Sequence, residues 1–528
     1  MLGLNYRRVA LLISSLCIVA LLFGWQTESF VEAEDSITFA KRIMDGTAIL
    51  HPNHLIFEPL YALVVRMFPS LPPLLVAQSF TSMFALAALL SVYLLVSPRS
   101  GTGGALIAVW LVMTMYTFWH YAKVVDAYVP ALSLALMSLV VFDRLPRVTR
   151  PLGVTAMALL MAAAVLVHQL YIFLALLTTI ALAKDTRFEN EHLRYATLFS
   201  TIGILIVGGG YLFVYLADPI EIPFHRWAAG HARNGLWEPP NEKTPFAAVL
   251  AIGTTIVSVV PLLAYDCIAS FMDSVSGGKM LLEETYVASR VLNPLSAALL
   301  VASMGALVIS YLVLLGAALR RARLSALSGT QSLLLVAATV YMALVIVWEA
   351  TNREFWLHPL VFLLIALSQC IRWNRHMALV GVIAVTSGGL VNFWAGIAPL
   401  SDRNNDYWWT LSNDILTRVP NDAIVLMDCP WICQQYFAMA EGNIFYSGGG
   451  AEQNFDPEKI VSMDLKDVFL VDWAIAPLDT RNKTKVQHRK VFLERMASAF
   501  GSLPEPTRSD PFIRPDIWHW EERWQKLP

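Results

Sequence analysis

Four carboxylates and two histidines crowd the stretch 32-EAEDSITFAKRIMDGTAILHPNH-54, which directly follows the first apolar run of the chain. A carboxylate within hydrogen-bond reach of a hydroxyl can take its proton as a general base. Histidines and carboxylates together can also ligate a divalent metal. The alternative is a purely structural role, because the side-chain oxygen of Asp35 or Ser36 could cap a helix by accepting a hydrogen bond from a free backbone N–H.

The composition indicates that this stretch belongs to a membrane protein. Of the 528 residues, 56% are hydrophobic and 15% are charged, whereas soluble proteins have roughly 25% charged residues. Apolar runs long enough to cross roughly 30 Å of hydrocarbon predict an α-helical multispan protein with about eleven crossings. The predicted spans are 9–25, 73–96, 102–118, 125–142, 152–167, 169–183, 198–216, 294–318, 330–348, 356–371 and 377–397. The run 246–265 is predicted to be re-entrant or to lie along the outer surface.

Arginine and lysine in the short loops predict the orientation, because these residues resist translocation. The first span lacks the cleavage site of a signal peptide and is predicted to be a retained anchor with a cytoplasmic N-terminus. The loop 26–72 and the tail 399–528 are then extracytoplasmic. The positions predicted to be cytoplasmic are Arg7, Arg8, Arg99, Arg144, Arg147, Arg150, Lys184, Arg187, Arg194, Arg320, Arg321, Arg323, Arg372 and Arg375.

Two domains are predicted, a transmembrane domain over 1–398 and a soluble α/β domain over 399–528. The loop 26–72 has helical spacing in two pieces, which predicts two short helices on the membrane surface. In the tail, strands are expected at 423–427, 443–447 and 468–476, and helices at 433–441 and 485–500. The aromatic stretch 513–524 could serve as core or could stack on sugars. Cys429 and Cys433 could pair in an oxidising compartment unless their backbone is a regular helix.

Three motifs on the outer side resemble the GT-C glycosyltransferases, multispan enzymes that use lipid-phosphate sugars. Asp35-Ser36-Ile37-Thr38-Phe39, followed by His51-Pro52 and Pro59-Leu60-Tyr61, is similar to their first outer loop, in the branch that reads Asp-Ser-Gly-Glu-Phe and then His-Pro-Pro-Gly. The segment 118-FWHYAKVVDAYVPAL-132 resembles Phe-Trp-Ser-Gln-Ala with Glu-Val-Tyr, and His168-Gln169 stands where the family often has His-His. The resemblance covers 1–215, with an echo in 349-EATNREFWLHPL-360.

The chain departs from this pattern at several positions. Thr38 replaces the second acid of the loop, Asn53-His54 follows His51-Pro52, and Asp126 replaces the Glu of Glu-Val-Tyr. These changes leave the donor and the acceptor open.

The resemblance implies a set of site residues. Asp35 would be the base, with Glu34 as its deputy. The donor phosphate would be bound by His120, Lys123, His168 and Arg353, although a lysine or arginine at the membrane boundary could simply extend toward water. The supporting residues would be His51, His54, Glu58 and Asp126, and Glu58 or Asp126 could pair with Lys123. No cofactor is certain, and a divalent metal is an open alternative.

The expected reaction is inverting transfer of a sugar from a polyprenyl-phosphate donor to a lipid-linked glycan or a protein, in the inner membrane of a bacterium. An envelope glycan polymerase or ligase would instead depend on Arg226, His231 and Arg233. A transporter or flippase is a third alternative, against which the outer position of the acids and the lack of an inverted repeat argue. Nothing indicates nucleic-acid binding.

Overall fold

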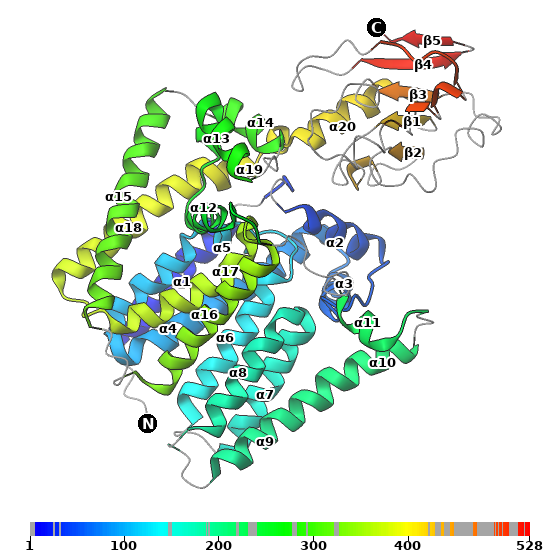
Figure 1. Cartoon of the computed structure of the whole chain (residues 1–528). Coiled ribbons are helices and arrows are strands. Elements are labelled where there is room, and N and C mark those ends of the chain that lie inside the picture. The colour runs from blue at the N-terminus through cyan, green and yellow to red at the C-terminus, as the bar shows by residue number, and fades with distance from the viewer. Residues whose placement is uncertain are drawn as a thin grey trace. The chain divides into compact units, whose positions relative to one another are not determined.

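The chain is mostly helical, with one small sheet in its C-terminal part (Figure 1). The computed structural model describes residues 6–24, 27–30, 33–145, 150–185, 187, 191–217, 221–230, 240–276, 282–291, 294–321, 327–420, 423–427, 435–437, 444–447, 468–471, 490, 493–494, 496–498, 500–505, 516–521 and 523–527. Glu32, His231, Arg233, Cys429 and Cys433 lie outside the described residues.

The described residues divide into two compact units. Unit 1 takes its residues from Met1–Thr27, Arg42–Pro261 and Leu292–Ser401. Unit 2 takes its residues from Glu28–Lys41, Leu262–Val291 and Asp402–Pro528. The segment that carries Asp35 therefore belongs to the same compact unit as the tail.

Helices fill unit 1. They are α1 (Tyr6–Phe23), α3 (Phe57–Met67), α4 (Pro73–Met113), α5 (Tyr116–Tyr121), α6 (Tyr128–Arg144), α7 (Arg150–Val167), η2 (Gln169–Tyr171), α8 (Ile172–Ala183), α9 (His192–Gly203), η4 (Ile204–Gly208), α10 (Gly209–Ala217), α11 (Phe224–Ala228), α12 (Thr244–Ile256), α15 (Pro294–Leu319), α16 (Gly329–Glu349), α17 (Arg353–Cys370), α18 (Arg375–Asn392), η8 (Phe393–Ile397) and α19 (Ala398–Leu400). Two further helices are shared between the units, α2 (Glu34–Asp45) and η6 (Val260–Ala264).

The protein is a multi-pass membrane protein. Among the described residues, six helical segments are long and apolar enough to cross a membrane: Pro73–Met113, Arg150–Val167, His192–Ala217, Ala297–Leu319, Gly329–Glu349 and Arg375–Leu400. Shorter apolar helices cover Val9–Phe23, Gln169–Ala183 and Thr244–Ile256. The last of these has 13 residues, or about 20 Å, which is too short for one straight crossing. The number of eleven crossings stays a prediction.

The long helix α4 is broken at Gly101, whose φ of 67° lies in the left-handed region that favours glycine. The break separates the predicted spans 73–96 and 102–118. Beside it, Arg99 forms an ion pair of 3.0 Å with Asp143 of α6. The chain turns here because glycine tolerates the backbone conformation that ends the first half of α4.

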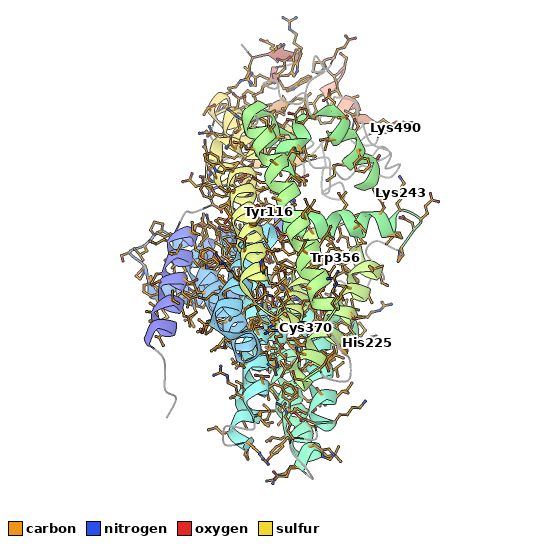
Figure 2. The ribbon with its side chains drawn as sticks, turned by 90° about the vertical axis from the view of Figure 1, so that its left-hand side faces the viewer. Tyr116, His225, Lys243, Trp356, Cys370 and Lys490 are labelled. Carbon is orange, nitrogen blue, oxygen red and sulfur yellow. The ribbon has the colours of Figure 1, made fainter. Side chains whose placement is uncertain are left out.

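Close helix packing holds unit 1 together, because lipid gives apolar helices little reason to associate and small residues let backbones approach. The helices α4 and α7 pack on α6, α16 packs on α17, and α15 packs on α18 (Figure 1). The ring of Trp373 lies against Gly104 of α4 and Gly381 of α18, and a Cβ at either glycine would press into that ring. Figure 2 shows Trp356 and Cys370 toward opposite ends of α17, with Tyr116 toward the Trp356 end.

Asn392 joins three helix ends inside unit 1. Its side-chain amide donates to Thr114 O at 2.5 Å and to Ile256 O at 2.8 Å. Its side-chain oxygen accepts from Ser258 N–H at 2.8 Å. Asn392 is fully buried. It therefore satisfies backbone groups that the ends of α4 and α12 would otherwise leave unpaired in the membrane interior.

Unit 2 contains a mixed five-stranded sheet with the order β2-β1-β3-β4-β5. The strand β1 (Ile424–Met427) is parallel to β2 (Ile444–Ser447) and β3 (Val468–Val471), whereas β4 (Ile517–Glu521) and β5 (Arg523–Lys526) form an antiparallel hairpin on β3. The helices of this unit are α13 (Asp266–Ser276), α14 (Leu282–Val291), η9 (Arg403–Asn405) and α20 (Tyr407–Arg418). The sheet confirms an α/β fold for the tail, and its hairpin was not expected.

The aromatic stretch 513–524 contributes to the core of the sheet. Trp518 and Trp520 pack against a buried cluster that includes Ile424 and Phe500. The ring of His519 stacks on Phe469 with centroids 4.6 Å apart. The described part of this stretch therefore serves as core.

Replacing Asn392 by leucine should lower the thermal stability of the protein in detergent. The change leaves Ser258 N–H, Thr114 O and Ile256 O without this partner, and each buried unpaired group costs about 1–3 kcal/mol. Thermal unfolding followed by circular dichroism measures the effect. Thr339→Ala is the control, because that hydroxyl is exposed and bonds only within its own helix to Leu335 O. Equal melting temperatures for both variants would contradict the role of Asn392.

Candidate active site

The loop between α2 and α3 docks against the junction of α7 and η2 within unit 1. Gln169 N–H donates to Asn53 O at 2.9 Å, and Ile56 N–H donates to Leu166 O at 3.2 Å. These backbone bonds bring the predicted His51-Pro52 and His168-Gln169 motifs to one place. The sequence separates these motifs by more than 100 positions.

His54 and His168 lie ring against ring at this junction. Their centroids are 4.7 Å apart, with an interplanar angle of 84°. His54 Nδ1 lies 3.3 Å from Val167 O, so Nδ1 must carry the proton when it donates to this carbonyl. His168 Nδ1 accepts from Leu170 N–H at 3.2 Å, which leaves the ring proton on Nε2 when the ring is neutral. The two rings therefore differ in tautomer.

The three basic residues His120, Lys123 and Arg353 form what we call the basic cluster. His120 and Lys123 are each 1% exposed. Neither ring nitrogen of His120 and not the Nζ of Lys123 has a hydrogen-bond partner in the described part of the chain. The guanidinium carbon of Arg353 lies 5.6 Å from the ring centroid of Tyr116. Thr255 Oγ1 donates to Arg353 O at 2.9 Å and fixes the start of α17.

Burial perturbs the titration of His120 and Lys123, and nearby positive charge adds to the effect on His120. Burial, together with the positive charges of Arg353 and Lys123, lowers the pKa of His120 to about 3. Burial lowers the pKa of Lys123 to about 7. Lys123 does not extend to water, so the boundary alternative does not describe it. Strongly perturbed groups of this kind concentrate at functional sites.

A carboxylate that the sequence analysis did not select stands next to Arg353. Glu354 accepts from Tyr121 Oη at 2.5 Å and from Tyr128 Oη at 3.0 Å. Asn352 caps α17 through Glu354 N–H and also donates its amide to Glu354 at 2.7 Å. Glu354 thus joins α5, α6 and α17. The available signal was its position next to Arg353 within 349-EATNREFWLHPL-360.

His358 is a second residue that the sequence analysis missed. Its Nδ1 lies 2.8 Å from Tyr171 Oη. Its ring lies 5.7 Å from Tyr128 and 6.2 Å from His168, measured between centroids. The available signal was a histidine inside an apolar helix, a placement that is costly and therefore often functional.

The supporting carboxylates have partners other than Lys123. Glu58 is 1% exposed, lies 3.0 Å from Arg42 and accepts Ile49 N–H at 3.1 Å. Burial raises the pKa of Glu58, while Ile49 and Arg42 oppose the rise. Asp126 accepts from Tyr128 N–H at 3.3 Å. Because Lys123 Nζ forms no hydrogen bond with any described residue, the expected pairing of Glu58 or Asp126 with Lys123 is not formed.

Asp35 and Glu34 stand in the first turn of α2, within unit 2. The Asp35 side chain is exposed, while Ser36 and Ile37 of the same helix are fully buried. Tyr128 links His168 to the basic cluster, because its ring lies 5.0 Å from that of His168 and its hydroxyl bonds Glu354 beside Arg353. The roles of Asp35 and Glu34 remain predictions.

The described residues contain no group of three or more His, Cys, Asp or Glu side chains arranged to hold a metal ion. His51 Nδ1 accepts from Asn53 N–H at 3.3 Å, and its ring lies 6.3 Å from that of His54. His51 thus forms a side-chain hydrogen bond within the loop, whereas His54 bonds Val167 outside it.

Acid should destabilise the protein partly through His120. The unfolded chain takes up this proton near pH 6.5, whereas the folded site takes it up only near pH 3. The stabilising contribution is therefore complete above pH 6.5 and is lost as the pH falls from 6.5 toward 3. The melting temperature of His120→Phe should fall less steeply over this range than that of the wild type. Phe118→Leu, which perturbs buried packing without removing a titrating group, should keep the wild-type slope, and an equal slope for His120→Phe would contradict the burial of a neutral ring.

Several solved structures are similar to this chain. No protein-family model and no curated protein matches the chain. The oligosaccharyltransferase of Archaeoglobus fulgidus in its apo form is similar, with a TM-score of 0.52 and 12% identity over 91% of this chain and 72% of that chain. ArnT from Cupriavidus metallidurans bound to undecaprenyl phosphate has a TM-score of 0.45 and 13% identity, over 88% of this chain and 92% of that chain. Archaeal AglB from Archaeoglobus fulgidus, in complex with an inhibitory peptide and a dolichol-phosphate, has a TM-score of 0.46 and 13% identity, over 93% of this chain and 72% of that chain. The first of these similarities shows that the chain shares the fold of that oligosaccharyltransferase, in agreement with the GT-C-like architecture expected from the sequence.

Proposed function

We propose that the protein is an inverting glycosyltransferase of the GT-C type, which moves a sugar from a polyprenyl-phosphate donor to a lipid-linked glycan or a protein. The observation that carries this proposal is the basic cluster. Its buried nitrogens on His120 and Lys123 lie beside Arg353 and lack protein partners among the described residues. A fold alone does not define an activity, so the proposal depends on this site.

A phosphate group would relieve the strain of the basic cluster. Removing positive charges from water is costly unless opposite charge and hydrogen bonds compensate for it. A lipid phosphate supplies both, because its oxygens accept charge-assisted hydrogen bonds from lysine and arginine. Binding would favour the charged form of Lys123, whose pKa of about 7 leaves it only partly protonated at neutral pH.

The proposed reaction needs a base and a stabilised leaving group. The acceptor oxygen attacks the anomeric carbon of the sugar, and the bond between that carbon and the phosphate oxygen breaks. The proton of the acceptor hydroxyl passes to the carboxylate of Asp35. The electron pair of the broken bond leaves on the lipid phosphate, whose charge His120, Lys123 and Arg353 would stabilise.

The neighbouring residues would orient these groups. His168 would complete the phosphate site, with His54 fixing its ring. His51 would hold the turn of the outer loop. The pair of tyrosines on Glu354 would position the carboxylate beside Arg353.

We place this site on the extracytoplasmic face of the inner membrane of a bacterium, with the N-terminus in the cytoplasm. The transmembrane domain would cover 1–398, and the extracytoplasmic domain over 399–528 would contact the acceptor. Two alternatives predict different results. A polymerase or ligase would depend on Arg226 and Arg233, and a transporter would not change covalent glycan structure.

Replacing Asp35 by asparagine should reproduce the loss of one sugar that deletion of the gene causes. The amide cannot accept the hydroxyl proton, and loss of a general base typically costs about 10²–10⁴-fold in rate. Mass profiling of glycans and glycolipids, at matched protein abundance, measures the effect. The control is Asp45→Asn, an exposed carboxylate at the other end of the same helix.

If the Asp35→Asn variant gives wild-type glycan profiles, Asp35 is not the catalytic base. Unchanged profiles in the deletion itself would favour the transporter. If Arg226→Met loses the product while Asp35→Asn still makes it, the result would favour the polymerase.

Undecaprenyl phosphate should bind the basic cluster. Lys123→Met removes a charge-assisted hydrogen bond worth about 1.5–3 kcal/mol, so the Kd should rise about 10- to 100-fold. Binding to the purified protein in detergent can be followed by thermal stabilisation over a range of lipid concentrations. Lys243→Met is the matched control, because Lys243 is exposed. An unchanged Kd for Lys123→Met would exclude the cluster as the phosphate site.

A further inference from the structure

Asp406 lies fully buried in unit 2, at the start of α20, and its carboxylate accepts four hydrogen bonds. Oδ1 accepts from Trp409 N–H at 3.0 Å, which caps the helix. Oδ2 accepts from Ser29 Oγ at 3.0 Å, from Phe30 N–H at 3.1 Å and from Tyr436 Oη at 2.5 Å. Oδ1 therefore caps α20, whereas Oδ2 connects the Ser29–Phe30 segment with Tyr436.

We propose that Asp406 is a positioning residue for the glycosyl transfer, because it anchors Ser29 and Phe30 and thereby fixes the segment that leads into the Asp35 helix. This inference rests on the proposed function, in which Asp35 is the base. Its new content is the identity of the group that holds the base in place.

The anchored segment is short and closely packed. The ring of Phe30 meets Tyr436 edge to face at 6.2 Å between centroids. Phe30 and Tyr436 are both buried, and so is Ala33 just before α2. Because α2 begins at Glu34, only a few residues separate the anchor from Asp35. Small displacements of a catalytic group can cost about 100-fold in rate, so this anchor bears directly on turnover.

The chemistry of Asp406 suits an anchor. An ionised carboxylate only accepts hydrogen bonds, and all four groups around it donate. Burial raises the pKa of Asp406, while the hydrogen bonds from Tyr436, Trp409, Ser29 and Phe30 act in the opposite direction. These hydrogen bonds thus offset the free-energy cost of burying a charged carboxylate. A carboxylate that only caps a helix at the surface would not have this cost.

Asp406→Asn separates the two tasks of this side chain. Asparagine keeps one acceptor oxygen and remains a good helix cap, but its amide nitrogen donates and cannot replace Oδ2. Hydrogen exchange of the amides in 28–41 should accelerate about tenfold or more, while those of α20 stay protected. The sugar product in cells should fall about tenfold or more. The Kd for undecaprenyl phosphate should stay within about twofold, because the basic cluster is unaltered.

Asp414→Asn is the matched control. It removes the same charge from the same helix, but Asp414 pairs with Arg418. This variant should leave both the exchange of 28–41 and the product unchanged. If Asp406→Asn does not accumulate, Tyr436→Phe and Ser29→Ala each remove one bond to Oδ2, and each should accelerate exchange of 28–41 about fivefold.

Unchanged protection of 28–41 in Asp406→Asn, or in both single-bond variants, would overturn the inference. A parallel loss of undecaprenyl phosphate binding and product would also overturn it, because that result indicates general destabilisation. Lost product in Asp35→Asn with normal product in Asp406→Asn would reject only this inference. Normal product in Asp35→Asn would instead reject the proposed base, whatever Asp406 does.

Discussion

Burial of basic side chains away from water is the constraint on which the site in unit 1 depends. Burial, together with the charges of Lys123 and Arg353, keeps the ring of His120 neutral except in acid, and burial lowers the pKa of Lys123. Backbone contacts hold these groups in place. Arg353 lies in the first turn of α17, behind a cap from Asn352, and its carbonyl is held by Thr255. In the proposed function the site would therefore be preorganised for the donor phosphate, since the cost of burying the basic groups is met before the ligand binds.

The two units solve a common problem with single buried polar side chains. Helices that end inside a protein leave backbone groups unpaired. In unit 1, Asn392 satisfies the ends of α4 and α12 beside η8, using both its donor and its acceptor. In unit 2, Asp406 does so for α20 and the segment before α2, using acceptors alone. The choice of amide or carboxylate follows the groups to be paired, because Asn392 meets carbonyls and Asp406 meets only donors.

The sequence predicted a multispan helical framework, because the length of a span follows directly from the thickness of the bilayer. It anticipated the break at Gly101 as a loop between two spans. The sequence did not predict the hairpin of β4 and β5, because its aromatic and charged residues form a short alternating pattern that also occurs on exposed surfaces. The site was predicted in part. His120, Lys123 and Arg353 were selected, but the bonds of Glu354 connect three helices, and no local pattern in the sequence encodes them.

Asn53, His54 and Gln169, three of the positions that depart from the GT-C pattern, lie at one joint in the structure. Asn53 O accepts from Gln169 N–H, and Gln169 in turn donates its side-chain amide to Ala228 O at 2.5 Å. Gly230 has a φ of 56°, and a Cβ there would collide with the Asn53 side chain. Asn53, Gln169 and Gly230 therefore depend on one another sterically, and His54 extends the joint to His168. Because His168 belongs to the proposed phosphate site, this joint would help to position it.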